Sequence, residues 1–167
     1  MSDENKISKN QPLLHKITTL ISKKFGQDVI VSAEINPLAN DMPIFAVSRN
    51  SYFKIAKFLK QHDELSFDYL VNLHGTDFET HMEIFLQLRS LNNDFEIAIK
   101  VCVDRENPTV PSVESIWPAA NWAESETYDL LGIHFALHPN LERIFLGENW
   151  VGYPLRKDYQ PYDEEVL

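Results

Sequence analysis

Three acidic residues lie within one short segment near the C-terminal end of the chain. Glu124, Glu126 and Asp129 occur in AANWAESETYDLLG, which spans residues 119–132. Carboxylates spaced this closely can ligate a metal ion, share a proton as a general acid/base pair, or pair with basic side chains. Two histidines follow in IHFALHP, and imidazole can join carboxylates in either kind of catalytic site. This segment is therefore the first candidate for chemistry.

The segment is predicted to be a helix. Pro118 suits its first turn and Gly132 suits its end. On that helix, Trp122, Glu126 and Asp129 fall on one face, at positions i, i+4 and i+7. We expect this face to be packed, and a buried carboxylate without a partner is very costly.

Four interpretations of these carboxylates are open. We favour ion pairs with Arg143, Arg156 or Lys157, in this chain or in a neighbour. A metal site would recruit His134 and His138, whose HxxxH spacing matches one face of a helix. The other two interpretations are a general acid/base pair and exposure to solvent. Flanking Gly and Pro residues argue against a helix at the histidines, so we expect His138 in a turn and His134 partly exposed.

Motifs for other enzyme chemistry are absent from the sequence. It contains no GxSxG, no GxxxxGK[ST] phosphate loop and no GxGxxG, and it has only five glycines. The single cysteine, Cys102, excludes an internal disulfide and an iron–sulfur cluster held by four thiolates of this chain. We therefore expect no catalytic, cofactor-binding or metal-binding residue here.

Composition and charge narrow the class of protein. The chain has 167 residues, 44% of them hydrophobic, and a formal net charge of −10. Residues 121–167 hold three basic and nine acidic side chains, which disfavours binding to a phosphate backbone. No segment approaches the roughly 18 apolar residues of a membrane span. Residues 1–11 are polar and are predicted to be a disordered lead-in, so any membrane association would be indirect.

Periodicity predicts an α+β domain over residues 12–132. Apolar residues from Leu13 to Phe25 recur at helical spacing, and a second helix is expected after Asn50 or Ser51. Strands are predicted at 28–35 and 44–49. Three further strands show period-two alternation, beginning at Leu65, Met82 and Phe95, and the NND turn at 92–94 joins the last two as an antiparallel hairpin. The order favours a mainly antiparallel sheet with helices on one face, followed by a helix and an extended irregular arm.

A string of short motifs runs from Pro111 to Tyr159. In order, they are Pro-Ser-Val, Asn-Trp, Glu-any-Glu, Tyr-Asp, Gly-Ile, His-Pro, Leu-any-Arg-Ile and Gly-any-Pro-Leu-Arg-Lys-Asp-Tyr. Their order and spacing resemble the signature of the C subunit of respiratory complex I, the NADH:quinone oxidoreductase, known as the 30-kDa subunit in mitochondria. The usual pattern is changed at five positions: Ser125 replaces Arg, Leu131 Phe, Leu137 Gly, Tyr153 His and Gln160 Pro. The missing glycine is expected to alter a turn, and the missing arginine removes an ion-pair partner.

The resemblance implies a non-catalytic structural subunit in the peripheral arm of a proton-translocating complex. That complex would pass electrons from NADH through FMN and Fe–S clusters to quinone, with none of these cofactors bound by this chain. The implied partners are the quinone-site subunit and the Fe–S subunits, at the cytoplasmic face of the inner (plasma) membrane. Three alternatives are open: an equivalent subunit of a membrane-bound hydrogenase or other quinone-linked complex, a stand-alone metal-dependent enzyme, and a free binding module.

Residues 133–167 are predicted to form an extended arm for contacts between subunits. The segment has little periodicity, and it is rich in the residue types that anchor interfaces, including Trp150 and Tyr162. We expect Arg156 and Lys157 to pair with acidic groups where the domain meets a partner, Arg156 with bidentate geometry. The alternative is that the arm wraps its own domain. The candidate interface residues are Glu124, Glu126, Asp129, Arg143, Tyr153, Leu155, Arg156, Lys157, Asp158 and Tyr159.

Overall fold

The computed structural model describes residues 8–161. Most of the predicted lead-in and the end of the predicted arm, with Tyr162, lie outside the described residues. Within them, no helix is long and apolar enough to cross a membrane. The elements, in chain order, are α1 (Gln11–Phe25), η1 (Gln27–Val29), β1 (Ile30–Asn36), η2 (Pro37–Ala39), β2 (Met42–Val47), α2 (Tyr52–Gln61), β3 (Tyr69–Asp77), β4 (Met82–Ser90), β5 (Phe95–Val103), β6 (Thr109–Pro111), α3 (Ala120–Leu131) and β7 (His134–Ala136).

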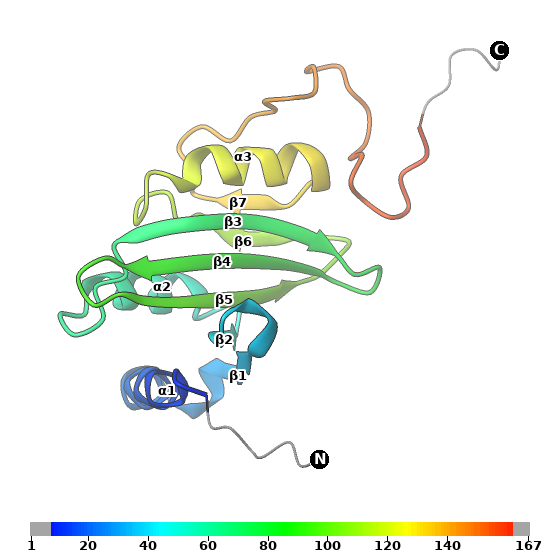
Figure 1. Ribbon diagram of the computed structural model, residues 1–167. Helices are drawn as coiled ribbons and strands as arrows, with labels where there is room; N and C mark the ends of the chain where they lie inside the picture. The colour runs from blue at the N-terminus through cyan, green and yellow to red at the C-terminus, as the bar shows by residue number, and fades with distance from the viewer. Residues whose placement is uncertain (1–7, 162–167) are drawn as a thin grey trace.

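Five strands form the main sheet, in the order β1-β2-β5-β4-β3 (Figure 1). All neighbouring pairs are antiparallel except β2 and β5, which run parallel. The predicted hairpin is confirmed, because β4 and β5 pair in continuous register from Met82↔Val103 to Ser90↔Phe95. The mainly antiparallel α+β fold is thus confirmed, with one parallel pair in its centre.

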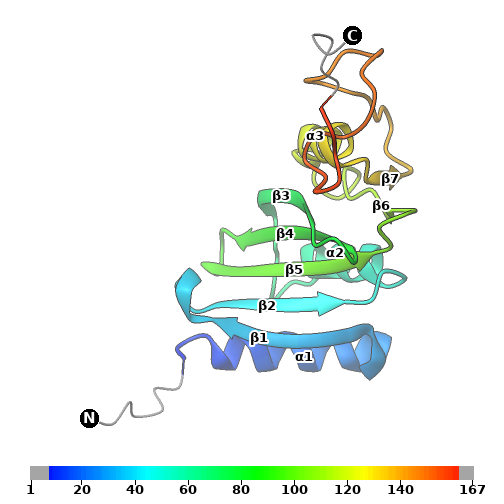
Figure 2. The same cartoon turned by 90° about the vertical axis from the view of Figure 1, so that its right-hand side faces the viewer.

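The helices share one face of the sheet. Residues in register across β2, β5, β4 and β3 point to the same side, and the row Phe45, Ile99, Leu86, Leu73 is buried in a single core. Side chains of α1, α2 and α3 join that core. Figure 2 shows α1 beside β1, at one edge of the sheet, and α3 beyond β3, at the other.

The two N-terminal helices follow the predicted apolar faces. In α1, the buried residues are Leu13, Leu14, Ile17 and Ile21, and Gly26 ends the helix with a φ of 99°. In α2, which begins after Ser51, the predicted face of Tyr52, Ile55, Ala56 and Leu59 is fully buried. Burial of these apolar stripes explains why the periodicity was sufficient to find both helices.

The predicted alternation in the third strand is wrong at two residues. Tyr69 and Val71 are exposed, whereas Leu70 and Leu73 are buried. The register between β3 and β4 shifts between Leu70 and Asn72. An extra residue at such a β-bulge reverses the side on which the following side chains lie, and a simple period-two count does not include it.

The segment around α3 contains structure that the sequence patterns did not indicate. β6 lies in the proline-containing segment between β5 and α3, and β7 follows α3. The two pair in parallel, with Val110 opposite Phe135. This two-stranded sheet returns the chain to the core, since both of those side chains are buried. After β7, residues 137–161 are irregular, as expected for the arm.

Candidate functional site

The carboxylates of α3 have very different surroundings. Trp122 is 68% exposed and Glu126 is exposed, so the prediction that their face is packed along its length is wrong. Asp129, on the same face, is fully buried because the arm covers only the last turns of the helix. Glu124 lies on another side of α3 and is also fully buried.

Asp129 is the anchor for the first part of the arm. Its Oδ2 accepts hydrogen bonds from the backbone N–H groups of Ile144, Phe145 and Leu146, at 2.7–3.0 Å. Its Oδ1 accepts from the Arg143 guanidinium at 2.9 Å. Burial alone would raise the pKa of Asp129, but these donors together hold it below its usual range. The favoured interpretation, ion pairing with Arg143, is therefore confirmed for this residue.

Glu124 is held by hydrogen bonds, and no arginine or lysine of the described residues pairs with it. Ser112 Oγ donates to its Oε2 at 2.5 Å, and the Val113 N–H donates to its Oε1 at 2.7 Å. Burial raises the pKa of Glu124 to about 7, against the two hydrogen bonds, and the charge of Glu114 adds to the rise. This carboxyl group therefore exchanges a proton near neutral pH.

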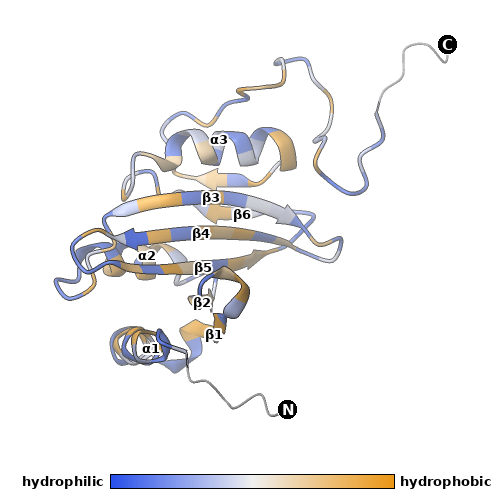
Figure 3. Cartoon of the chain, viewed as in Figure 1, coloured by the Kyte–Doolittle hydropathy of each residue, from blue (hydrophilic) through white to orange (hydrophobic). Residues whose placement is uncertain are grey.

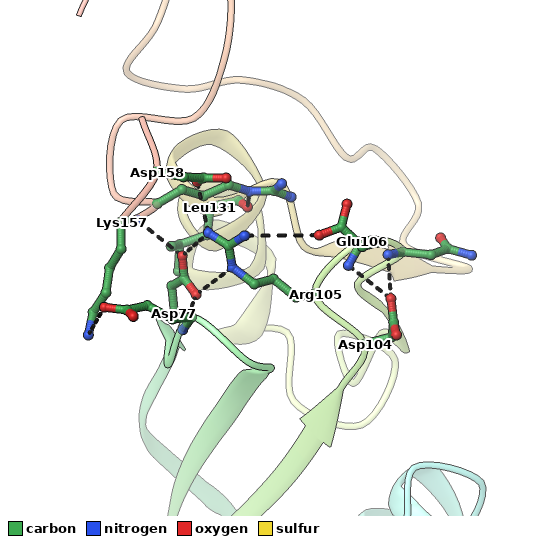
Figure 4. A network of polar contacts seen from close by, with 10 residues as sticks. Asp77, Asp104, Arg105, Glu106, Leu131, Lys157 and Asp158 are labelled. Atoms are coloured by element: carbon green, nitrogen blue, oxygen red, sulfur yellow. Dashed lines mark hydrogen bonds and ion pairs between the residues drawn. The ribbon is translucent and has the colours of Figure 1, made fainter. Parts of the chain in front are cut away.

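A second anchor joins the end of the arm to the sheet (Figure 4). Asp77, at the end of β3, accepts a bidentate pair of hydrogen bonds from Arg105, both 2.9 Å. The Lys157 N–H also donates to Asp77 at 3.0 Å, and Asp158 pairs with Arg105 at 2.8 Å. The Arg105 hydrogen bonds, supported by the backbone donors, hold the pKa of the buried Asp77 far below its usual range.

No sequence pattern indicated Asp77 or Arg105 as functional residues. The two residues lie 28 positions apart, in a strand end and a loop, and neither belongs to a periodic pattern. The sequence could have indicated this pair only through the residue types, a carboxylate and an arginine. An arginine is the side chain best suited to a bidentate pair with a carboxylate.

Stacking of cations on Tyr153 supports the middle of the arm. The guanidinium groups of Arg143 and Arg156 lie 5.1 and 4.8 Å from its ring centroid. Gly132, at the end of α3, allows the ring to approach, because a Cβ there would lie 2.6 Å from Tyr153. The site thus explains why a glycine with a φ of 74° suits this position.

The predicted bidentate pair of Arg156 is not formed among residues 8–161. Arg156 Nε donates to the Leu131 carbonyl oxygen at 2.7 Å. Lys157 Nζ lies 3.7 Å from Glu79, an exposed pair of small energetic value. The described part of the arm therefore wraps its own domain, and a pairing of Arg156 or Lys157 with a partner stays a prediction.

The histidines do not share a helix face. His134 lies in β7 and is exposed, whereas His138 has a fully buried side chain beside a turn with Pro139. The helical HxxxH interpretation is wrong for this reason, and the expected turn is confirmed. In residues 8–161, no group of three or more His, Cys, Asp or Glu side chains is arranged to hold a metal ion.

Large apolar side chains of the arm are exposed although its backbone is anchored. Figure 3 shows hydrophobic segments interspersed along the arm beyond α3. Leu155 is 59% exposed, while its N–H donates to the Leu130 carbonyl oxygen. Tyr159 lies against Gly152 and is partly buried. The exposed apolar residues of the arm are Leu137, Phe145, Trp150, Val151 and Leu155.

Comparison with known proteins gives one consistent result. Residues 45–165 match the family model described as respiratory-chain NADH dehydrogenase, 30 Kd subunit. The C subunit of NADH-quinone oxidoreductase from Roseiflexus sp. (strain RS-1) is 47% identical over 115 residues, which cover 67% of this chain and 66% of that protein. The same subunit from Chlorobium phaeobacteroides is 37% identical over 145 residues, which cover 84% and 85%. The match thus spans about two thirds of the Roseiflexus protein and a larger share of the Chlorobium protein.

Two solved structures share the fold. The trypsin-resistant fragment (1-134) of Nqo5 has a TM-score of 0.57 and 26% identity, over 66% of this chain and 89% of the fragment. A chain of the membrane-bound sulfane sulfur reductase, an archaeal respiratory membrane complex, has a TM-score of 0.64 over 87% of this chain and 85% of its own length. Its identity is 20%, so this second likeness concerns the fold alone.

Proposed function

The chain belongs to the family of the 30-kDa subunit of respiratory-chain NADH dehydrogenase, and we propose that it is a non-catalytic structural subunit of such a complex. In this proposal it lies in the peripheral arm of a proton-translocating NADH:quinone oxidoreductase. It supports electron transfer from NADH, through FMN and Fe–S clusters, to quinone. These cofactors belong to sister subunits, and this chain contributes by holding those subunits in place.

One observation carries the proposal. The arm is tied to the domain by Asp77 and Asp129, whereas its largest apolar side chains point to solvent. An exposed apolar surface with an already ordered backbone is suited to binding another protein, because little further order must be imposed. Trp122 on α3 is exposed in the same way and belongs to the proposed contact surface.

The proposed partners are the quinone-site subunit and the Fe–S subunits of the peripheral arm. Contact with them would place the chain at the cytoplasmic face of the membrane without a membrane span of its own. Exposed residues such as Glu126, Phe145 and Leu155 would make the contacts directly. Glu124 and Asp129 would act indirectly, since their carboxylates are already occupied within the chain.

Purification from the source cell's membranes through a tag at Met1 tests the proposal. Mass spectrometry should recover Fe–S and quinone-site subunits with the wild-type chain. A double variant, Phe145→Asp with Val151→Asp, should lose them, since charges there cannot be buried against a partner. The matched control is Leu38→Asp, which changes a side chain that is 96% exposed but lies in η2, far along the chain from the arm.

Each outcome of this experiment is decisive. Loss of partners in the double variant alone, with unchanged circular dichroism, supports the proposed surface. Recovery of all partners with the double variant would contradict that surface. Recovery of the wild-type chain alone, without any sister subunit, would contradict the structural role itself.

A further inference from the structure

A buried polar cluster surrounds Glu124 of α3, whose carboxylate takes part in neither of the two arm anchors. Three elements contribute to it: Tyr52 from α2, Glu124 from α3, and His138 from the turn after β7. All three side chains are buried, and Glu124 Oε2 lies 3.9 Å from His138 Nε2. This cluster is separate from the ion pairs that anchor the arm at Asp77 and Asp129.

Two atoms of the cluster have no hydrogen-bond partner among residues 8–161. They are the Tyr52 hydroxyl and His138 Nε2. The other ring nitrogen, Nδ1, accepts the Asn140 N–H at 3.1 Å, so the proton of the neutral imidazole is on Nε2 and faces Glu124. Buried polar groups are nearly always paired, and exceptions often have a function. The cluster is thus a hydrogen-bond network in which these two polar atoms are left unpaired.

The turn that delivers His138 is strained. Leu137 has a φ of 66° and a side chain that is 97% exposed, so it gains little packing in return. A side-chain-bearing residue holds a left-handed conformation only where its surroundings over-determine it. Here those surroundings are β7 on one side and the buried His138 ring on the other.

We propose that Glu124 and His138 form a proton-controlled latch that attaches the start of the arm to the domain. With Glu124 protonated, the cluster carries no buried charge and the latch is closed. When Glu124 loses its proton, the turn at 137–140 releases, His138 leaves the core and water reaches the carboxylate. The latch belongs to this chain and does not depend on which complex the chain joins.

The groups that surround Glu124 decide how strongly its protonated form is favoured in the closed latch. From its neighbours it receives two neutral donors, Ser112 and Val113, and the repulsion of Glu114. The charge of Glu124 in turn adds to the effect of burial in raising the pKa of Tyr52. Two basic groups of neighbouring segments have partners of their own: Lys60 of α2 donates to the Ile116 carbonyl oxygen, and Arg143 pairs with Asp129. Burial and the charge of Glu114 therefore oppose ionisation of Glu124, and they outweigh the hydrogen bonds from Ser112 and Val113, which favour the anion.

Hydrogen exchange of the full chain between pH 5.5 and 8.5 tests the latch. After correction for intrinsic exchange rates, protection of the amides of 137–146 should fall by up to about tenfold per pH unit as pH rises to 7 and level off above it, because opening is linked to the loss of one proton. Glu124→Gln should remove this dependence, since an amide remains neutral throughout. Glu126→Gln changes an exposed residue of the same helix and should behave as wild type.

A second measurement keeps the test decisive if Glu124→Gln does not fold. Infrared spectra of the wild-type chain should show a buried protonated carboxyl group at pH 6 that is lost by pH 8, together with the change in protection. Constant protection of 137–146 across this range, or protection that rises with pH, would overturn the proposal. So would a pH dependence that persists in a folded Glu124→Gln variant.

Discussion

At the scale of residues, the carboxylates of this chain differ by the donors that surround them. Asp77 and Asp129 each meet an arginine and backbone N–H groups, so both are stable as anions. Glu124 meets only neutral donors and is buried, which favours its protonated form. Glu126 is exposed and free to contact another protein. These four residues are of only two, chemically similar types, and their environments give them different properties.

The anchor at Asp77 is expected to contribute measurably to stability. Asp77→Asn should lower the free energy of unfolding by about 2 kcal/mol, the value of a charge-assisted hydrogen bond that is lost from a buried site. Urea denaturation at pH 7 measures this change. Asp158→Asn, at the solvent side of the same network, is the control and should have a much smaller effect, since that side chain is 61% exposed. Equal effects of the two variants would contradict the assignment of Asp77 as the anchor.

Leu137 is expected to be a site of stored strain. Leu137→Gly should raise the free energy of unfolding by up to about 1 kcal/mol, because glycine adopts positive φ without the steric cost. The thermal midpoint and urea denaturation measure this change. Leu38→Gly is the matched control, since Leu38 is equally exposed but does not have a positive φ. It should lower stability, and a decrease in both variants would show that Leu137 is not strained.

At the scale of elements, α3 connects three parts of the molecule. Thr127 and Leu131 pack against Gly75 of β3, Glu124 holds the segment after β6, and Asp129 holds the arm. Its first and last turns differ accordingly, since Trp122 is exposed while Leu131 is buried. Movement of this one helix would therefore be transmitted to the sheet and to the arm together.

The contact between α3 and β3 is expected to tolerate no added volume. In Gly75→Ala, the new Cβ would lie 2.7 Å from Thr127 Cγ2 and 2.9 Å from Ile133 Cδ1. Overpacking of this kind should cost about 1–3 kcal/mol in the free energy of unfolding. Gly147→Ala is the control, because no atom lies within 4 Å of its Cβ position. A wild-type urea midpoint for Gly75→Ala would mean that α3 can shift away from the sheet.

At the scale of the whole molecule, the described part of the arm folds onto its own domain, and in the proposed complex it would also contact a partner. Its backbone and charged groups are used to fold onto this chain, at Asp129, Leu131 and Asp77. Its large apolar side chains are exposed, and in the proposed complex they would contact the partner. This division explains how a segment without regular structure can present a defined surface.

Stability is expected to depend on pH through two groups of opposite sign. The pKa of Glu124 is raised from 4.5 to about 7, so its contribution of about 3 kcal/mol is complete below pH 4.5 and is lost as pH rises to 7. The pKa of Asp77 is lowered, so its contribution is present at neutral pH and is lost as pH falls below about 4. Urea denaturation should therefore show a maximum near about pH 5.

Comparison with Glu124→Gln isolates the contribution of Glu124 to the fall in stability between pH 5 and 7. The loss of overall negative charge near the sequence pI of 5.0 also affects stability, but it does so equally in both proteins. The difference between wild type and variant should therefore change between pH 5 and 7. A difference that is constant with pH would contradict the raised pKa.

The amino-acid sequence alone was sufficient for the helices, the β4–β5 hairpin, the α+β class and the family. Each of these depends on local information: apolar residues at spacings of 3.6 or 2, capping residues such as Gly26 and Gly132, and a string of motifs in a set order. The irregular segment after β7 was also predicted, because the lack of periodicity is itself a local property.

Only the tertiary structure decided which carboxylate does what. The pairs Asp77–Arg105 and Glu124–His138, and the β6–β7 strand pairing, join residues that no local spacing relates. The helical wheel placed Trp122, Glu126 and Asp129 together, yet the arm covers only the last of them. Burial depends on which distant segment covers a side chain, and burial sets the cost of a charge. The roles of Asp77, Glu124 and Asp129 are therefore properties of the folded chain.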